Sequence, residues 1–131
     1  MLDIKGYTTF KKIKPINKGW SSDKKHYIET VANKKLLLRI AGILEYDKKN
    51  SEFEMMKRIA ESGVSMSKPI DFGICDNGKS AYSLFTWCDG EDADIVLPKM
   101  TKTRQYELGV KSGLLLRKIH TIPAPDEQEP W

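Results

Sequence analysis

Cysteine and histidine are scarce in this sequence, with two of each among 131 residues. No CxxC or HxxxH spacing occurs, so we expect neither a structural nor a catalytic zinc site. The start of the chain carries no apolar leader segment, and we therefore predict a cytoplasmic location. Cys75 and Cys88 could pair on paper, but free buried thiols are the expected state in that reducing compartment.

Long hydrophobic runs and a one-sided charge are also missing. No apolar run approaches the ~20 residues that cross a bilayer, which argues against a membrane protein. The 22 Lys and Arg are interspersed with 18 Asp and Glu, for a formal net charge of +4. Because no basic face is concentrated, nucleic acid is not an expected partner. The length fits one domain and is short for an enzyme with two lobes.

Alternating apolar and polar residues predict three antiparallel strands in the first forty residues. Residues 7–14 and 26–30 flank a polar tip at 17–24 that contains Gly19, a pattern typical of a β-hairpin with a long loop. A third strand is expected over residues 35–40. Its alternation turns Leu37 and Arg39 away from the face that carries Leu36, Leu38 and Ile40.

Arg39 stands near the end of an otherwise apolar strand and could either reach solvent or pair with a carboxylate. A helix predicted over residues 51–62, or from near Asp47, offers that carboxylate. Ser51 and Glu54 fit a capping box, which would occupy Glu54 at the helix start. Helical spacing at 3.6 residues per turn predicts an inward stripe. The stripe comprises Glu52, Met55, Met56 and Ile59.

Two further strands, a polar break and a long helix complete the expected order. Strands are predicted over residues 70–74 and 80–87, joined by a turn at Asn77-Gly78, the dipeptide that suits a type I′ hairpin. A polar break follows, and residues 101–120 then have helical periodicity. The helix carries an apolar stripe of Leu108, Ser112, Leu115, Leu116 and Ile119. An acidic, proline-rich tail ends at residue 131.

This order of elements is similar to the small lobe of a protein-kinase-like phosphotransferase. On its motifs the sequence resembles the aminoglycoside phosphotransferase family of antibiotic kinases. The supporting segments are Asn17-Lys18-Gly19-Trp20-Ser21-Ser22, Leu37-Leu38-Arg39-Ile40, Glu52-Phe53-Glu54-Met55-Met56, Pro69-Ile70-Asp71-Phe72-Gly73, Trp87-Cys88-Asp89-Gly90-Glu91-Asp92 and Leu116-Arg117-Lys118-Ile119-His120.

The resemblance implies an α+β fold, with about five antiparallel strands and one packed helix, followed by a hinge and one long helix. It divides the chain into a nucleotide-binding lobe at residues 1–88 and a segment at 89–131 that would begin a second lobe. It also implies that ATP or GTP binds together with Mg²⁺, and that the acceptor is an aminoglycoside-like small molecule.

The resemblance also implies which residues would face the phosphates. Arg39 takes the position that the family usually gives to a lysine, with Glu52 as its helix partner, and the substitution changes the reach and aim of the cation. Gly19, Ser21 and Ser22 would form the phosphate-facing loop tip. An ordinary hairpin turn is the alternative, because the loop has one glycine where protein kinases have G-x-G-x-x-G.

Adenine is expected at the other end of the same cleft. The resemblance places it against the backbone of Thr86 and Cys88, with Leu37 on the cleft-facing side of the third strand. The alternative for Leu37 and Cys88 is simple core packing. Contacts through the backbone do not constrain the identity of the side chains, so the sequence predicts where the hinge lies but not which base it would bind.

The catalytic loop motif H-G-D-x-x-x-x-N occurs nowhere in the 131 residues. Asp71-Phe72-Gly73 precedes the hinge and is not the metal-binding D-F-G of a kinase. We therefore predict no catalytic and no metal-binding residue here. The hypothesis is an amino-terminal nucleotide-binding portion of a longer kinase, inactive alone and weak in nucleotide affinity. The alternative is a non-catalytic α+β binding or regulatory module with the same topology.

The helix predicted over residues 101–120 would pack into the second lobe in the family. Without that lobe, its apolar stripe would expose several hundred Å² of surface, a size that typically marks an interface. We therefore expect self-association or rearrangement through this helix.

Overall fold

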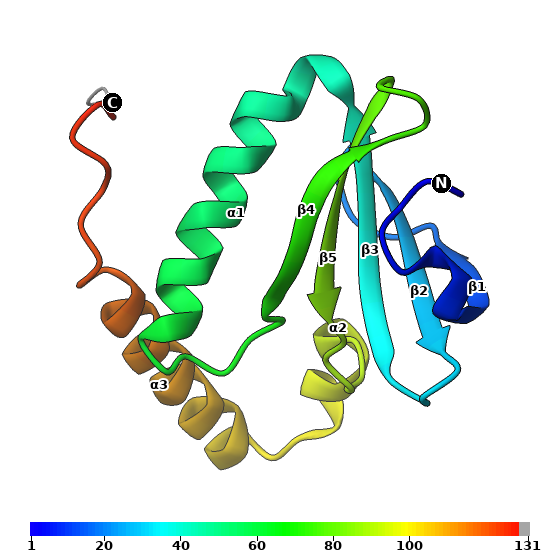
Figure 1. The fold of residues 1–131 in the computed structure, drawn as a ribbon. Coiled ribbons are helices and arrows are strands. Elements are labelled where there is room, and N and C mark those ends of the chain that lie inside the picture. The colour runs from blue at the N-terminus through cyan, green and yellow to red at the C-terminus, as the bar shows by residue number, and fades with distance from the viewer. Residues whose placement is uncertain (129–131) are drawn as a thin grey trace.

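Five antiparallel strands form a single sheet in the computed structural model, which describes residues 1–128 (Figure 1). The strand order is β1-β2-β3-β5-β4. The strands are β1 (Phe10–Ile16), β2 (Lys24–Thr30), β3 (Lys35–Gly42), β4 (Pro69–Cys75) and β5 (Ser80–Thr86). The main helices are α1 (Tyr46–Glu61), which connects β3 to β4, and α3 (Lys102–Ile119). The α+β fold of a kinase-like small lobe is thereby confirmed.

Short helical turns complete the chain. They are η1 (Tyr7–Thr9), η2 (Ile43–Glu45), α2 (Ala93–Val96) and η3 (Leu97–Lys99). The last two lie between β5 and α3, where a polar break without helices was predicted, so that prediction was wrong in part. In the β4–β5 turn, Asn77 and Gly78 both have positive φ, and the Lys79 amide donates to the Asp76 carbonyl at 3.2 Å. The predicted turn is confirmed.

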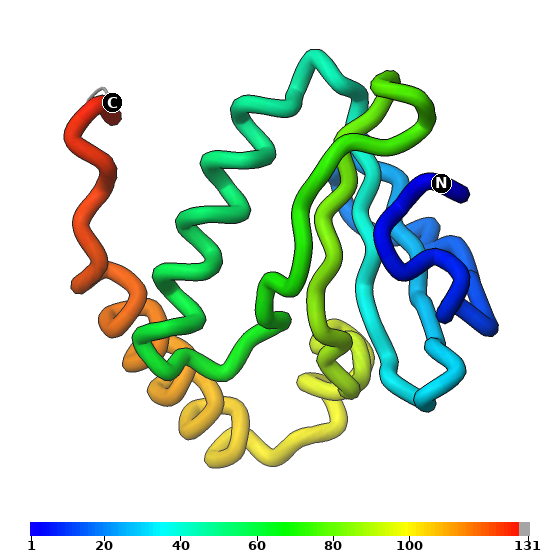
Figure 2. Tube along the Cα trace, in the orientation of Figure 1, coloured from blue at the N-terminus to red at the C-terminus, as the bar shows by residue number. Residues whose placement is uncertain are grey.

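The two faces of the sheet carry two different sets of packed side chains. Leu38 and Ile28 are fully buried on one face, where Ile4 from the N-terminal segment covers them. Figure 2 shows residues 1–9 and α1 on opposite sides of the sheet. The N-terminal ammonium group donates to Asp76, which fastens the segment to the β4–β5 turn. Leu38 therefore lies at the centre of the main core.

The opposite face is packed by aromatic rings from α1 and two strands. Phe53 lies 5.5 Å from Phe72 and 6.0 Å from Phe85 between ring centroids, and it is the one buried residue of α1. The expected inward direction of Glu52 was wrong, because Phe53 points at the sheet and the Glu52 side chain is 48% exposed. The predicted capping box was also wrong, since α1 begins at Tyr46 and Ser51 lies in its second turn.

The two cysteines are unpaired, as expected, but only one of them is buried. Cys75 is enclosed at the end of β4, and burial raises the pKa of its thiol. Cys88 is exposed just past β5. Its expected burial was wrong because the chain leaves the sheet at Thr86, one residue before the predicted strand end.

Helix α3 exposes most of its apolar side chains. Leu108, Leu115 and Leu116 are 40%, 42% and 52% exposed, respectively. The self-association expected through this helix stays a prediction. No helix within residues 1–128 is long and apolar enough to span a bilayer. The end of the predicted acidic tail, residues 129–131, lies outside the described residues.

Gly73 on β4 lies against the ring of Tyr82, its partner on β5. A Cβ at this position would lie 2.9 Å from the Tyr82 ring, whose hydroxyl donates to Asp71 at 2.7 Å. We expect Gly73→Ala to lower the free energy of unfolding by about 1.5 kcal/mol, because the fixed ring cannot yield freely. Urea denaturation followed by circular dichroism measures this change.

Gly42→Ala is the matched control for that substitution. Gly42 has φ −65°, and a Cβ there would meet nothing within 4 Å. We expect a change within about 0.5 kcal/mol, with stabilisation favoured because alanine restricts the unfolded chain. Equal losses from both substitutions would contradict the proposed crowding against Tyr82.

Candidate functional site

Arg39 projects from the centre of β3 onto the face of the sheet that α1 covers. Its guanidinium donates from Nε and Nη2 to Asp23 Oδ2, at 3.1 and 2.8 Å. Nη2 also lies 3.2 Å from Ser21 Oγ. Within residues 1–128 no hydrogen bond involves Nη1, and the side chain is 32% exposed. The Nη1 edge of the guanidinium therefore keeps two donors for another group.

Asp23 ends the loop between β1 and β2, immediately before Lys24 begins β2. Its side chain is only 3% exposed and lies between two cations, Arg39 and Lys49. Burial alone would raise the pKa of Asp23, but the hydrogen bond from Lys49 and the positive charges of Arg39 and Lys49 outweigh it, so the pKa is lowered. Asp23 is therefore an ionised carboxylate held inside the protein.

Lys49 comes from the first turns of α1 and is the second cation on Asp23. Its Nζ lies 3.1 Å from Asp23 Oδ2, 3.5 Å from Glu52 and 3.8 Å from Glu45. Burial by itself would lower the pKa of Lys49, but the hydrogen bond to Asp23 and the nearby carboxylates raise it. The side chain is 13% exposed. Lys49 thus links the loop carboxylate to the helix.

The predicted pair between Arg39 and Glu52 is not formed. The two side chains line the same small cavity of about 20 Å³, together with Asp23 and Lys49. Glu52 pairs with Lys49 instead, three residues earlier on the same helix. The reason is rotational, because Phe53 takes the sheet-facing position of α1 and leaves Glu52 at the edge of the helix.

The loop of residues 17–23 borders a concavity of about 380 Å³. Gly19 has φ +91°, a backbone conformation that suits glycine, and a Cβ there would lie 2.8 Å from Lys25 Nζ. Ser21 and Ser22 are both exposed; Ser21 Oγ accepts a hydrogen bond from the Asp23 amide at 3.1 Å, whereas within residues 1–128 no hydrogen bond involves the Ser22 hydroxyl. The structure therefore brings Ser21 to Arg39, whereas Gly19 lies in the same loop against Lys25.

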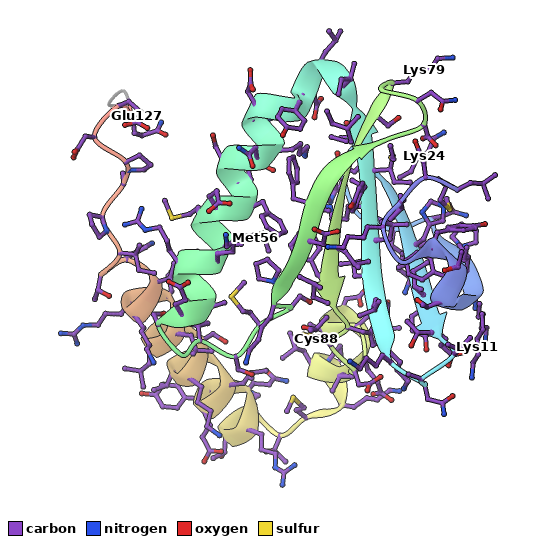
Figure 3. All side chains as sticks on the ribbon, viewed as in Figure 1. Lys11, Lys24, Met56, Lys79, Cys88 and Glu127 are labelled. Atoms are coloured by element: carbon purple, nitrogen blue, oxygen red, sulfur yellow. The ribbon has the colours of Figure 1, made fainter. Side chains whose placement is uncertain are left out.

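The hinge residues lie at the far end of the same sheet. Figure 3 shows Lys24, at the start of β2, and Cys88, just past β5, at opposite ends of the strands. The Trp87 amide donates to Lys35 at 3.2 Å, while within residues 1–128 no hydrogen bond involves the Cys88 amide. That amide is free to donate to another group, and adenine binding at this backbone stays a prediction.

The strand register relates the hinge to the cation. Leu36 pairs with Thr86, and Arg39 lies three residues further along β3, which is about 10 Å at 3.3 Å per residue. Leu37 is half-buried and points to the Arg39 face of the strand. The edge-on contact of Tyr27 with Trp87, 4.8 Å between centroids, borders the hinge end. Leu37 and Arg39 therefore share one face of the sheet, between the hinge end of β3 and the loop before β2.

A Mg²⁺ site among the described side chains would need a ligand set of several oxygen donors around one point. Within residues 1–128 no group of three or more His, Cys, Asp or Glu side chains is placed to hold a metal ion. The described side chains therefore do not form a Mg²⁺ site.

Sequence reasoning missed Asp23 and Lys49. Asp23 directly follows Ser21-Ser22 in the predicted loop, and Lys49 precedes Glu52 by one helical turn. The second spacing is a signal for an ion pair along the helix. The contact between Asp23 and Lys49 joins residues 26 positions apart and has no local signature.

These observations define a kinase-like small lobe: a five-stranded sheet, a packed helix, a glycine-containing loop, an arginine held by an aspartate, and a hinge. A sequence model of the family described as Phosphotransferase enzyme family matches residues 12–131, and the chain belongs to this family. The predicted resemblance is confirmed. No curated protein matches the sequence significantly.

Proposed function

We propose that the chain is the nucleotide-binding portion of a phosphotransferase that transfers the γ-phosphoryl group of ATP or GTP to a hydroxyl of a small, aminoglycoside-like acceptor. The supporting observation is the held guanidinium of Arg39. It lies beside the Gly19 loop and about 10 Å along β3 from the hinge, so one extended ligand can reach both. The proposal includes the predicted division of the chain, in which residues 1–88 form the nucleotide-binding lobe.

Phosphoryl transfer needs little covalent help from the protein. The bond between the γ-phosphorus and the β–γ bridging oxygen breaks, and a bond to the acceptor oxygen forms. The protein must position the reactants and offset phosphate charge. The two free N–H groups on Arg39 Nη1 can donate to phosphate oxygens, and charge-assisted hydrogen bonds of this kind are stronger than neutral ones. Gly19 allows the loop backbone to approach them.

Deprotonation of the acceptor is not assigned to any residue of this chain. The motif that carries the catalytic aspartate in the family is absent from the 131 residues. We therefore propose that the chain alone binds nucleotide weakly and transfers no phosphoryl group. Mg²⁺ would accompany the nucleotide and be held by groups other than the described side chains.

Nucleotide titration of the ¹⁵N-labelled chain tests the binding proposal. We expect ATP or GTP to shift the amide signals of Gly19, Leu37 and Cys88, and adenosine or guanosine to shift Leu37 and Cys88 but not Gly19. Arg39→Gln is expected to weaken triphosphate binding about tenfold, because a hydrogen bond to a charged group contributes about 1.5 kcal/mol. Nucleoside binding should change by less than about twofold.

Arg104→Gln, on exposed α3, is the matched control and should leave both affinities unchanged. A wild-type chain that binds triphosphates no better than nucleosides would contradict the proposal. That result would favour the alternative, a non-catalytic binding or regulatory module with the topology of the lobe.

A further inference from the structure

We propose that Asp23, rather than Glu52, is the carboxylate that positions Arg39 for the phosphate groups, and that Lys49 holds Asp23 in place. The proposal rests on the proposed function, because it concerns the same nucleotide site. The residue that positions Arg39 is thereby Asp23 in the loop, and the contribution of helix α1 comes from Lys49 and not from Glu52.

The contacts of Arg39 divide its guanidinium into two edges. Nε and Nη2 donate to Asp23 Oδ2, and Nη2 also donates to Ser21 Oγ, with 3.2 Å between the nitrogen and the oxygen. These three interactions fix the plane and the direction of the group. Both hydrogens of Nη1 stay available among the described residues. Asp23 therefore orients Arg39 without using the donors that a phosphate would take.

Glu52 lacks the geometry for this task. Its side chain is 48% exposed, and the cation within ion-pair distance is Lys49 at 3.5 Å. An exposed carboxylate with rotational freedom restricts a partner little, and exposed pairs of this kind contribute little energy. Asp23, by contrast, is 3% exposed, directly precedes β2 and contacts both Arg39 and Lys49.

Stability alone does not account for the Asp23 cluster. Asp23 Oδ1 is buried without a hydrogen-bond partner in the described chain, so the carboxylate is desolvated and only half satisfied. A buried ionic group of this kind is often less stabilising than an apolar side chain of similar volume. Such an arrangement is expected where a charge is needed for function. Here that function is the binding of phosphate oxygens by the free Nη1 group of Arg39.

Lys49 extends the arrangement to α1. Because its Nζ contacts Asp23 at 3.1 Å, the loop carboxylate lies between a strand cation and a helix cation. The helix thereby fixes Asp23, Asp23 fixes Arg39, and Ser21 couples the loop tip to the same guanidinium. The position of α1 is thus transmitted to the phosphate-binding cation through Lys49.

The test compares ATP with adenosine binding for Asp23→Asn, Glu52→Gln and Arg39→Gln by NMR titration. A folding defect lowers the affinities for ATP and for adenosine alike. Mispositioning of Arg39 lowers the ATP affinity alone, and with it the ATP-over-adenosine ratio. We expect Asp23→Asn to lower the ATP-over-adenosine ratio about tenfold, and Glu52→Gln to change it less than twofold. The double variant of Asp23→Asn with Arg39→Gln should lose no more than Arg39→Gln alone.

The Nε–H signal of Arg39 in the nucleotide-free chain is an independent readout. It should be shifted and slow to exchange in the wild type and in Glu52→Gln, and both properties should be lost in Asp23→Asn. Asp23→Glu, which keeps the charge, should recover most of the ATP preference. If Asp23→Asn proves unfolded, the Nε–H signal of the wild type still decides, because an unshifted and fast-exchanging signal would overturn the positioning role of Asp23.

Separate outcomes overturn the two proposals. If the wild type shows no ATP preference, the proposed function fails, and the role of Asp23 toward phosphates fails with it. If the wild type and Arg39→Gln behave as expected but Asp23→Asn keeps or increases the ATP preference, only the positioning role of Asp23 is overturned. A loss of preference in Glu52→Gln with Asp23→Asn unchanged returns the role to Glu52.

Discussion

Leu38→Ala is expected to lower the free energy of unfolding by about 3 kcal/mol. Leu38 is fully buried at the centre of β3, where it pairs with His26 on β2 and Leu84 on β5. Removing its branched end deletes apolar contacts and leaves a cavity that neighbouring strands cannot close, because they are hydrogen-bonded on both sides. Urea denaturation followed by tryptophan fluorescence and circular dichroism measures the change.

Leu44→Ala is the matched control, since Leu44 is the same residue type but 99% exposed in the turn before α1. We expect a change within about 0.5 kcal/mol. A loss at Leu38 no greater than that at Leu44 would mean that the central strand is not the core of the chain in solution.

Asp23→Ala is expected to lower the free energy of unfolding at pH 7 by about 2 kcal/mol. The variant leaves the partly buried cations Arg39 and Lys49 without their shared carboxylate, which is the costly way to break a buried ion pair. The loss stays below that of a fully enclosed pair because Arg39 can reach water. This prediction concerns stability and is independent of nucleotide binding.

The effect of Asp23 should depend on pH in one direction. Its pKa is lower in the folded chain than the ordinary value of 3.8. The folded state therefore favours the ionised group, and the stability it contributes is present above about pH 5 and is lost as the pH falls through the folded pKa. The difference between wild type and Asp23→Ala should shrink over that interval.

Glu54→Ala provides the control for this pH dependence. Glu54 pairs with Lys57 at 3.2 Å on the exposed side of α1. We expect it to change stability by less than about 0.5 kcal/mol at pH 7. A wild-type to Asp23→Ala difference that persists unchanged at pH 2 would show that the carboxylate charge is not the stabilising feature.

The elements of the fold were predictable because each has a local signature. Alternation along residues 35–40 follows from the two-residue period of a strand, and the structure confirms it in the burial of Leu36, Leu38 and Ile40. Asn77-Gly78 defines its turn through backbone conformation. Helix α1 was predicted with two alternative starts, and it begins at Tyr46, next to the alternative near Asp47 and five residues before Ser51. The start at Ser51 was wrong, since the N-terminal turns carry charged residues without an apolar period.

The direction of Glu52 was a more consequential error. The prediction took Met55, Met56 and Ile59 as the inward stripe. Glu52 lies three, four and seven residues before them, and at 100° per residue it falls on the same stripe. The sheet instead offers the rings of Phe72 and Phe85, and Phe53 packs between them. Which face of a helix is buried depends on what the sheet presents, and that information lies outside the helix.

The family, the order of strands and helices, and the face of β3 that carries Arg39 can be predicted from the residues alone, because they depend on motifs and short-range periodicity. Which carboxylate meets Arg39 becomes clear only from the packing of the folded chain. The choice between Asp23 and Glu52 depends on how a loop, a strand and a helix that are separate in sequence pack together. The scarcity of cysteine and histidine predicts no zinc site, and the charged side chains form their central cluster through contacts that no local pattern records.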